Sequence, residues 1–263
     1  MLNIGKLDSD LLKSLIFNQI KYKSDDVKVR PGIGEDCAVI GFGDWDCVMS
    51  TDPITSAVSD IGRLAIHITC NDIASNGVQP LGIMLAVMLP VGTTEKDVAT
   101  IMEQAASTAA EVGVEIIGGH TEITPAVNQP VIVSTAIGKS PADNSQSGND
   151  MVAGDSVLIT KAVGLEGSGI IACDFEEELA GVLTAEELSN TKDFLDQVSV
   201  VKEGVAAGNI GTHGMHDITE GGVFGAIWEM CQIADLGAEI NADLIPIEPE
   251  TVKVCDHFGI NPN

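Results

Sequence analysis

Aromatic side chains and positive charge are both scarce in this sequence. Aromatic residues make up 3% of the 263 positions, so the core has to be built from aliphatic side chains. Lys and Arg total 13 against 39 Asp and Glu, which gives a formal charge of −26. Such a charge repels nucleic acids and anionic membranes, and we expect neither as a partner. Metal ions and backbone N–H groups, rather than a lysine cluster, would have to hold any phosphate ligand.

Several common motifs are absent as well. The six cysteines form no C-x-x-C pair, which indicates a reduced, cytoplasmic protein rather than a disulfide framework or a zinc site. No signal peptide opens the chain, and the longest apolar run, from Ile83, is too short to span a bilayer. There is no G-x-x-x-x-G-K-[ST] and no G-x-G-x-x-G opening a helix after a strand. A P-loop and a dinucleotide-binding motif are therefore excluded, and no convincing Ser–His–Asp or Cys–His nucleophile arrangement is present.

The first part of the chain alternates predicted strands and helices, which indicates an α/β (α+β) fold. An amphipathic helix is expected to open near Asp8 or Ser9. Helices are then predicted over 59–77 and 93–113, and strands over 37–42, 47–51, 81–89, 114–117 and 130–138.

A change of composition predicts two domains. Residues 140–151 are rich in Ser, Asn, Asp and Gly and read as a linker between a domain over 1–139 and a second over 152–263. In the second domain we predict a strand at 155–160, a helix over 186–207, a helix over 223–234 and a final strand–helix pair. Because the sequence stops just after a helix, we expect this domain to be a truncated form of a longer architecture.

Three aspartates lie at the ends or buried faces of predicted elements. Asp36 directly precedes a strand, and Asp52 follows one. Asp72 continues the apolar stripe of the helix over 59–77, four residues beyond Ile68. A carboxylate on a buried face needs a partner, since an isolated buried charge costs several kcal/mol. That partner is either a metal ion or, in the simpler interpretation, a neighbouring turn or Arg63.

Several carboxylates together in a chain poor in cations suggest a hard divalent cation. Mg²⁺ is typically held by a few carboxylates together with substrate phosphates. A nucleotide could then bind despite the negative charge of the chain, because the metal neutralises its phosphates.

The segment "GGHTEIT" follows a predicted strand and combines two glycines with polar side chains. Gly118 and Gly119 allow close backbone approach, and N–H groups at such a turn can point at an anion. His120, Thr121 and Glu122 each supply a group that could face metal or phosphate. A histidine that only hydrogen-bonds at the surface or in the core is the alternative.

A second polar loop, "HDITEGG", precedes the predicted helix over 223–234. His216, Asp217, Thr219 and Glu220 are crowded before Gly221 and Gly222 at a helix start, where an anion is favoured. The alternative is a capping box in which Thr219 or Asp217 caps that helix. The loop "GLEGSG" at 164–169 fits a phosphate loop or a tight turn against a helix equally well.

Taken in order, "GIGEDCAVI", "STDPIT", "CNDIASNGVQP", "IIGGHTEIT" and "HDITEGGVFGAIWEM" resemble the PurM-like superfamily, which is related to aminoimidazole-ribonucleotide (AIR) synthetase. The most similar branch is the hydrogenase expression/formation family HypE. The resemblance implies two α/β domains, a homodimer whose N-terminal strands form a shared barrel, and ATP with Mg²⁺ between the domains.

The resemblance also assigns residues to roles. It implies metal ligation by Asp36, Asp52 and Asp72, and catalytic roles for Asp72, His120 and Glu122. The nucleotide would contact Gly34, Asp36, Asp52, Asp72, Gly118, Gly119, His120 and Thr121, and the substrate side would be the loop with Asp217, Thr219, Glu220, Gly221 and Gly222. In the superfamily's "GG-D/H/E-T" turn, His120 stands where many relatives carry aspartate.

We therefore predict an ATP- and Mg²⁺-dependent enzyme that phosphorylates or dehydrates an oxygen of an amide-like or small-molecule substrate, free or protein-borne. A role in hydrogenase maturation beside another maturation protein is the leading biological interpretation. HypE enzymes carry a reactive cysteine in a C-terminal tail, whereas the last cysteine here, Cys255, falls in a predicted helix. The alternatives are a non-catalytic nucleotide-binding scaffold, a phosphotransferase similar to thiamine-monophosphate kinase or selenophosphate synthetase, and a structural dimer without nucleotide.

Overall fold

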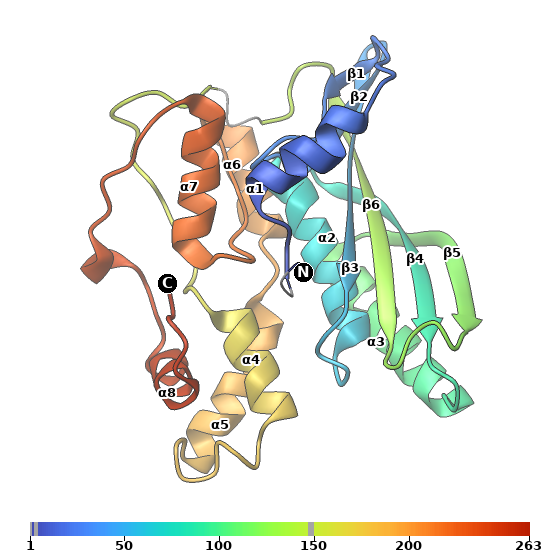
Figure 1. Cartoon of the computed structure of the whole chain (residues 1–263), viewed down its shortest axis with the longest axis vertical. Coiled ribbons are helices and arrows are strands. Elements are labelled where there is room, and N and C mark those ends of the chain that lie inside the picture. The colour runs from blue at the N-terminus through green and yellow to red at the C-terminus, as the bar shows by residue number, and fades with distance from the viewer. Residues whose placement is uncertain (1, 3–4, 147–149) are drawn as a thin grey trace.

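The chain folds into a sheet-containing N-terminal half and a helical C-terminal half (Figure 1). Residues of both halves line a cleft. The computed structural model describes residues 2, 5–146 and 150–263. Part of the predicted linker, residues 147–149, lies outside the described residues.

The N-terminal half is organised around a six-stranded sheet of order β1-β2-β3-β6-β4-β5. Strands β4 and β5 are parallel, because a helix crosses over between them, and all other neighbours are antiparallel. The strands are β1 (Val27–Val29), β2 (Ala38–Phe42), β3 (Trp45–Ile54), β4 (Pro80–Leu89), β5 (Glu115–Ile123) and β6 (Val131–Pro141).

Two helices, α2 (Ile61–Ser75) and α3 (Glu95–Val112), cover one face of this sheet. The predicted apolar face of α3 is confirmed: Ile101, Ala105 and Ala109 are buried. The helix opens with a capping box between Thr94 and Asp97 and ends at a left-handed Gly113. The main core lies between these helices and the inner side chains of β3, β4 and β6.

The opposite face of the sheet has no helix over it. Leu81, Met84 and Ile117 are about half exposed on this open face. The sheet of the single chain is therefore open and not a closed barrel.

The C-terminal half consists of helices and loops, and its predicted strands are wrong. Its described residues form only isolated bridges, Val163 with Ile247 and Ala180 with Leu183. Residues 155–160 form no regular secondary structure and pair with no described strand, and Leu158 is 90% exposed. A β-prone sequence forms a strand only where a neighbour supplies hydrogen bonds, and none lies beside this segment. The helices are α4 (Leu165–Asp174), α5 (Ala185–Lys192), η4 (Asp193–Gln197), α6 (Val201–Ile210), α7 (Gly222–Ala234), η5 (Ala242–Leu244) and α8 (Pro249–Phe258).

Two predicted helices are less regular than their sequences suggest. The helix over 186–207 is broken, because the Asn71 side chain donates to the Val198 carbonyl and accepts from the Val200 N–H, both at 2.9 Å. Near the N-terminus Asp8 caps α1 (Ser9–Leu11), as expected, but the segment continues as η1 (Leu12–Ile16), a π-helix, and η2 (Phe17–Gln19), a 3₁₀-helix. Across the described part of the chain, no helix has the length and apolarity needed to cross a membrane.

The two halves meet where α2 packs on α6. A side chain at Gly204 would run into the Ala74 backbone, and one at Gly208 would run into Gly77. The two glycines, four residues apart on α6, therefore let the helices approach closely. Leu195, Val198 and Val201 join the main core from the C-terminal side. One packed core thus spans the junction and fixes the floor of the cleft.

Candidate functional site

The predicted site residues of the two halves largely converge on the cleft. Its lining includes Asp36, Asp52 and Asp72 from the N-terminal half. The loop before α7 lines it from the other side, with Asp217, Thr219, Glu220, Gly221 and Gly222. Lys6 and Lys161 are the only Lys or Arg side chains among its described lining residues.

Asp72 is a buried carboxylate without a cationic partner among the described residues. It is 7% exposed, and the Ser50 hydroxyl of β3 donates to it at 2.5 Å. Burial and the neighbouring Asp52 carboxyl raise the pKa of Asp72 well above its usual range. Pairing with Arg63, the alternative considered above, is not observed.

Arg63 is instead engaged with two other carboxylates. It contacts Asp60 at 2.9 Å and also pairs with Asp196 of η4. The guanidinium therefore helps to connect α2 with the C-terminal half and leaves Asp72 free for a ligand in the cleft.

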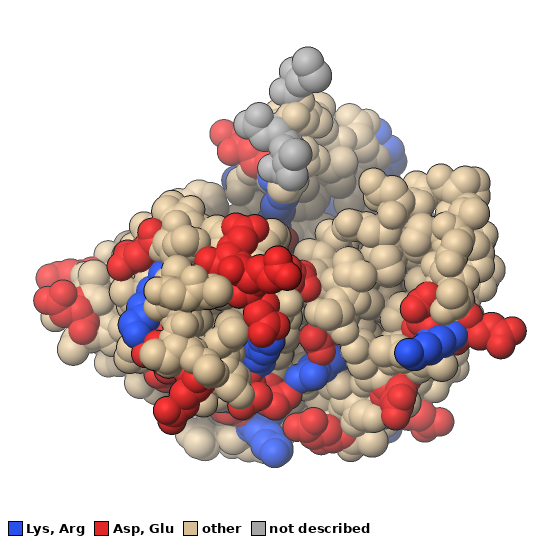
Figure 2. All heavy atoms as spheres, turned by 90° about the horizontal axis from the view of Figure 1, so that it is seen from below, with Lys and Arg blue, Asp and Glu red and all other residues tan. Residues whose placement is uncertain are grey.

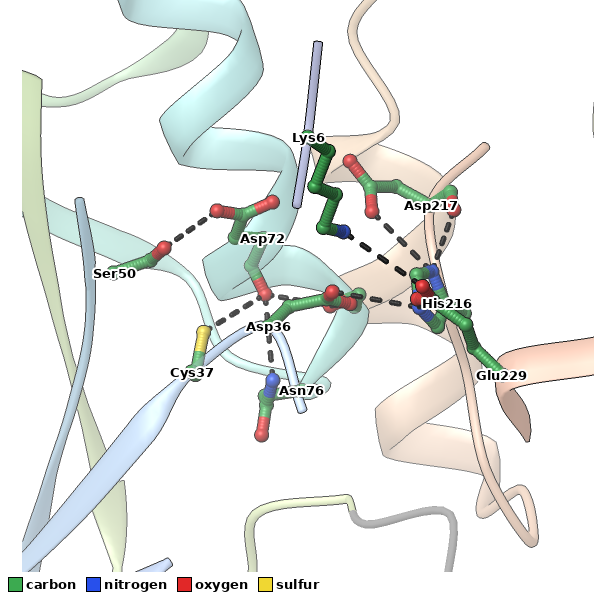
Figure 3. A network of polar contacts seen from close by, with 10 residues as sticks. Lys6, Asp36, Cys37, Ser50, Asp72, Asn76, His216, Asp217 and Glu229 are labelled. Atoms are coloured by element: carbon green, nitrogen blue, oxygen red, sulfur yellow. Dashed lines mark hydrogen bonds and ion pairs between the residues drawn. The ribbon is translucent and has the colours of Figure 1, made fainter. Parts of the chain in front are cut away.

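His216 connects carboxylates from both halves (Figure 3). Its Nδ1 donates to the Asp217 carbonyl at 2.6 Å, and its Nε2 donates to Glu229 Oε2 at 3.1 Å. Asp36 Oδ1 lies 3.5 Å from the same Nε2. Burial alone would lower the pKa of His216, but the bonds to Asp217 and Glu229 and the charge of Asp36 raise it to about 11. At neutral pH His216 is therefore an imidazolium ion.

The loop that carries Asp36 is shaped by Gly34. This glycine has φ +75°, and a side chain on it would strike Ile233 and the Glu229 carbonyl of α7. The "GIGED" loop therefore lies directly on α7 and brings Asp36 to His216. Ser75 of α2 donates to Asp36 at 3.3 Å and holds the carboxylate from the other side.

Two buried carboxylate oxygens in the cleft have no hydrogen-bond partner: Asp52 Oδ2 and Asp217 Oδ2. They belong to opposite halves, and their charges both act on Asp72. Unpaired buried carboxylates are costly, and a hard cation is the partner that satisfies several at once. The chemistry of these oxygen donors suits Mg²⁺, and Asp217, which the sequence placed only on the substrate side, is one of them.

Among the described residues, one set of three potential ligand atoms lies within 4.8 Å of one another: those of Asp36, His216 and Asp217. A protonated His216 has no free nitrogen lone pair with which to bind a metal ion. These three residues therefore form a network of ion pairs and hydrogen bonds, not a metal site. Metal ligation by Asp36, Asp52 and Asp72 together remains a prediction.

The start of α7 has no side-chain cap, so the capping-box alternative is wrong. Its N-cap is Gly221 in a left-handed conformation, and neither Asp217 nor Thr219 caps the helix. Asp217 turns toward His216 instead, 3.5 Å from Nδ1 (Figure 3). The first N–H groups of α7 are therefore left without side-chain acceptors at the edge of the cleft.

We expected the "GGHTEIT" segment to form a turn after a strand. In the structure, residues 118–123 belong to strand β5 instead. Gly118 and Gly119 have φ +153° and +146°, and a side chain on Gly119 would clash with the Leu85 backbone. The glycines are needed because the β4–β5 register shifts beside Met84, so that Ile117 is an extra residue on β5.

His120 and Glu122 lie on the opposite face of the sheet from the aspartates. They are opposite Ala86 and Met88 on the open face, with His120 Nε2 3.3 Å from Glu122 Oε2. Gly118–Thr121 line a separate small pocket beside Met102. Within one chain, the structure does not bring this segment together with the carboxylates in the cleft.

Three residues at the site were not among the candidate residues from sequence. Lys6 and Glu166 line the cleft, and Glu229 pairs with His216. Lys6 lies 3.7 Å from Glu229, which brings the N-terminal segment to α7. His216 stood out in its motif, but its bonds depend on which helices meet across the cleft. The position of Glu166 in a glycine loop gave only a weak signal.

The chain matches a known family over both halves. Residues 34–140 match the AIR synthase related protein N-terminal domain, and residues 152–257 match the corresponding C-terminal domain. A putative hydrogenase expression/formation protein of Methanocaldococcus jannaschii is 30% identical over 98% of this chain and 76% of its own length. The chain belongs to the AIR synthase-related family and has its two-domain fold.

Within that family the similarity includes HypE proteins. The carbamoyl dehydratase HypE of Bradyrhizobium diazoefficiens is 31% identical over 82% of this chain but 62% of its own length, so the chain spans less than two thirds of that relative.

Solved structures share the fold at lower identity. AaThiL complexed with AMPPCP and TMP has a TM-score of 0.77 and 19% identity over 99% of this chain and 82% of its own. HypE in complex with ATP gives 0.72 and 23% over 98% and 75%, and the HypE–HypF complex gives 0.74 and 22% over 95% and 79%.

Proposed function

We propose that the chain is an ATP-using enzyme that binds Mg·ATP in the cleft and activates an oxygen of an amide-like or small-molecule substrate by phosphoryl transfer. The observation that carries this proposal is the set of carboxylates without cationic partners: buried Asp72 and the unpaired oxygens of Asp52 and Asp217. A hard cation satisfies these groups, and nucleotide phosphates complete its coordination.

The residues of the chain would divide the work. Asp52, Asp72 and Asp217 would hold Mg²⁺, which when bound neutralises phosphate charge. The uncapped N–H groups at the start of α7 donate toward anionic oxygens. His216 donates a hydrogen bond to Glu229 and forms an ion pair with Asp36, so it links the two walls of the cleft. Such positioning and electrostatic stabilisation make up most of catalysis in phosphoryl transfer.

The acidity of the chain is consistent with a metal-dependent nucleotide site. Figure 2 shows one face of the molecule, on which acidic side chains are more widespread than basic ones. With only Lys6 and Lys161 as basic lining residues in the described part of the cleft, free ATP would be repelled. Binding should therefore depend strongly on the divalent cation.

The biological role we propose is hydrogenase maturation of the HypE type, with the chain acting beside another maturation protein. The similarity to carbamoyl dehydratases and the fold shared with a HypE–HypF complex support this role. A phosphotransferase of the thiamine-monophosphate kinase kind is the second candidate, favoured by the fold shared with AaThiL in complex with AMPPCP and TMP.

We also propose a homodimer formed through the open face of the sheet. Half-exposed Met84 and Ile117 lie on this face, and His120 and Glu122 occupy its β5 edge. Because these two polar residues do not reach the cleft of their own chain, any role at a nucleotide would require a second copy. The oligomeric state of the wild type and of a Met84→Glu variant tests the dimer, and we expect the variant to be a monomer. A monomeric wild type would exclude both the dimer and a role of His120 and Glu122 at a nucleotide.

Calorimetric titration of ATP tests the proposed function, with and without Mg²⁺. We expect the wild type to bind Mg·ATP in the micromolar range, and Asp72→Asn to bind at least about tenfold more weakly, a loss of about 1.4 kcal/mol. Asp44→Asn removes the same charge from the exposed β2–β3 turn and should bind as the wild type does. Binding that ignores Mg²⁺, or an Asp72→Asn variant that binds equally well, would overturn the proposal.

A further inference from the structure

Glu166 lies in the first turn of α4 and lines the cleft from the C-terminal half. Its carboxyl makes no hydrogen bond or ion pair with any described residue, although it is only partly exposed. A half-buried carboxyl without an internal partner has no structural role that accounts for it, so its position in the cleft directs attention to a ligand.

The local fold holds α4 from its other side. Ser168 hydrogen-bonds Thr251 of α8 at 3.1 Å, and a side chain on Gly169 would strike Leu195 of η4. The helix begins at Gly164 in a left-handed conformation, without a side-chain cap. The backbone beneath Glu166 is therefore fixed while its carboxyl stays free on the cleft side.

The surroundings make this carboxyl able to exchange a proton near neutral pH. Burial, and then the charges of Asp217 and Glu220, raise the pKa of Glu166 to about 7. Asp217 and Glu220 are the charged groups that face it, and none from α5, η4 or α8, the helices packed against α4, contributes. Catalytic acids and bases work best with pKa values near the working pH.

Several other titratable groups of the cleft are already engaged. His216 stays protonated because its pKa is raised to about 11, and Asp36 serves as one of its counterions. Asp72 accepts from Ser50 and lies beside Asp52. Of His216, Asp36, Asp72 and Glu166, only Glu166 makes no hydrogen bond or ion pair with a described residue.

A second, independent observation points to a ligand in the same space. Asp217 has a side chain 6% exposed, and its Oδ2 has no hydrogen-bond partner. Its carboxylate points into the cleft in Figure 3. An unsatisfied acceptor and a free carboxyl that sense each other's charge define a space where a ligand would contact both.

We propose that Glu166 accepts the proton of the substrate group that the nucleotide activates, an inference that rests on the proposed function. For an amide, the carbonyl oxygen bonds to the γ-phosphorus as the bond to the β,γ-bridging oxygen breaks and ADP leaves. The amide N–H proton passes to the Glu166 carboxylate, and the product is an O-phosphorylated imidate. With water as acceptor, the same carboxylate takes the water proton and the products are ADP and inorganic phosphate.

Glu166→Gln and Glu166→Asp test this role in the full chain. Mg·ATP binding is measured by calorimetry, and ADP release is followed with acetamide or with water alone, on both sides of neutral pH. We expect Glu166→Gln to bind Mg·ATP as the wild type does but to release ADP about 10²–10⁴-fold more slowly. The wild-type rate should rise with pH as the Glu166 carboxyl loses its proton, and this rise should disappear in Glu166→Gln. Glu166→Asp should keep the rise with a smaller loss of rate.

The controls separate this inference from the proposed function. Glu178→Gln removes an equal charge at an exposed position beyond α4 and should leave rate and pH profile unchanged. No Mg·ATP binding by the wild type would refute the proposed function, and the inference with it. Intact binding with an unchanged rate and pH profile in Glu166→Gln would refute the inference alone, and so would a wild type that binds Mg·ATP but cleaves it with neither acceptor.

Discussion

The two halves of the molecule differ in how their functional groups are held. In the N-terminal half, Asp52 and Asp72 are fixed by a sheet and two helices around one extensive core. The C-terminal half has two small clusters of four buried residues each: Val163, Val223, Ile227 and Ile245, and Ala172, Leu179, Leu183 and Val254. Its cleft residues lie on loops and helix starts. The N-terminal half thus supplies a rigid reference, and the C-terminal half depends on the junction for its placement.

The largest expected effect comes from the core of the rigid half. Ile73→Ala on α2 should lower the free energy of unfolding by about 3–5 kcal/mol, since Ile73 is fully buried in the main cluster. Ile227→Ala on α7 should lower it by only about 2 kcal/mol, because Ile227 is 8% exposed in a small cluster. Urea unfolding of both variants makes the comparison, and equal losses would contradict the difference between the halves.

A medium effect is expected at the junction. Gly204→Val places a side chain against the Ala74 backbone, which should force α6 away from α2 and destabilise the fold by about 1–3 kcal/mol. Hydrogen exchange should then speed up in α6 and α7 more than in β3 and β6.

Gly237→Ala is the matched control, because nothing lies within 4 Å of the added carbon. If Gly204→Val left exchange in α7 unchanged, the C-terminal half would not depend on the junction for its placement.

The smallest effect at neutral pH concerns His67 of α2, which is 2% exposed with an unpartnered Nδ1. Burial, with the charges of Arg63 and Lys161, lowers its pKa to about 4. The unfolded chain binds a proton at His67 below about pH 6.5, and the folded chain does so only near pH 4, so stability falls as pH drops through this window.

Above pH 6.5, the free energy of unfolding should vary with pH in the same way in His67→Leu and in the wild type. Below pH 6.5, it should fall less steeply in His67→Leu than in the wild type. Urea midpoints measured across this range check the difference between the two proteins. Parallel profiles down to pH 4 would show that His67 is not held neutral by the fold.

The sequence was most informative where the signal is local. The periodicity and caps of α3 and the buried carboxylate Asp72 could be predicted from neighbouring residues, because helix faces and end signals repeat within a few positions. The failures depend on distant partners. Residues 155–160 carry a strand-like pattern but meet no strand, and the break near Val198 is made by Asn71, far away in the chain.

Site prediction shows the same division. The loops bearing Asp36 and Asp217 could be selected from their motifs. The link between them is His216, whose partners come from two loops and α7 and from both halves. The two glycines of β5 were interpreted as a turn because a shift of register has no local signature. That register places His120 on the open face of the sheet, away from the aspartates. The sequence alone could not predict this separation.

Asn71 and Asp72 are consecutive on α2 but have different partners. Asp72 faces Ser50 and the cleft, and Asn71 clasps the backbone of residues 198–200. Both side chains belong to one rigid helix. A rotation of α2 that moved the Asp72 carboxylate would therefore also move the Asn71 amide and the segment that it binds. The residue that faces the ligand space and the residue that holds the segment before α6 are thus neighbours in the chain, joined by a single peptide bond.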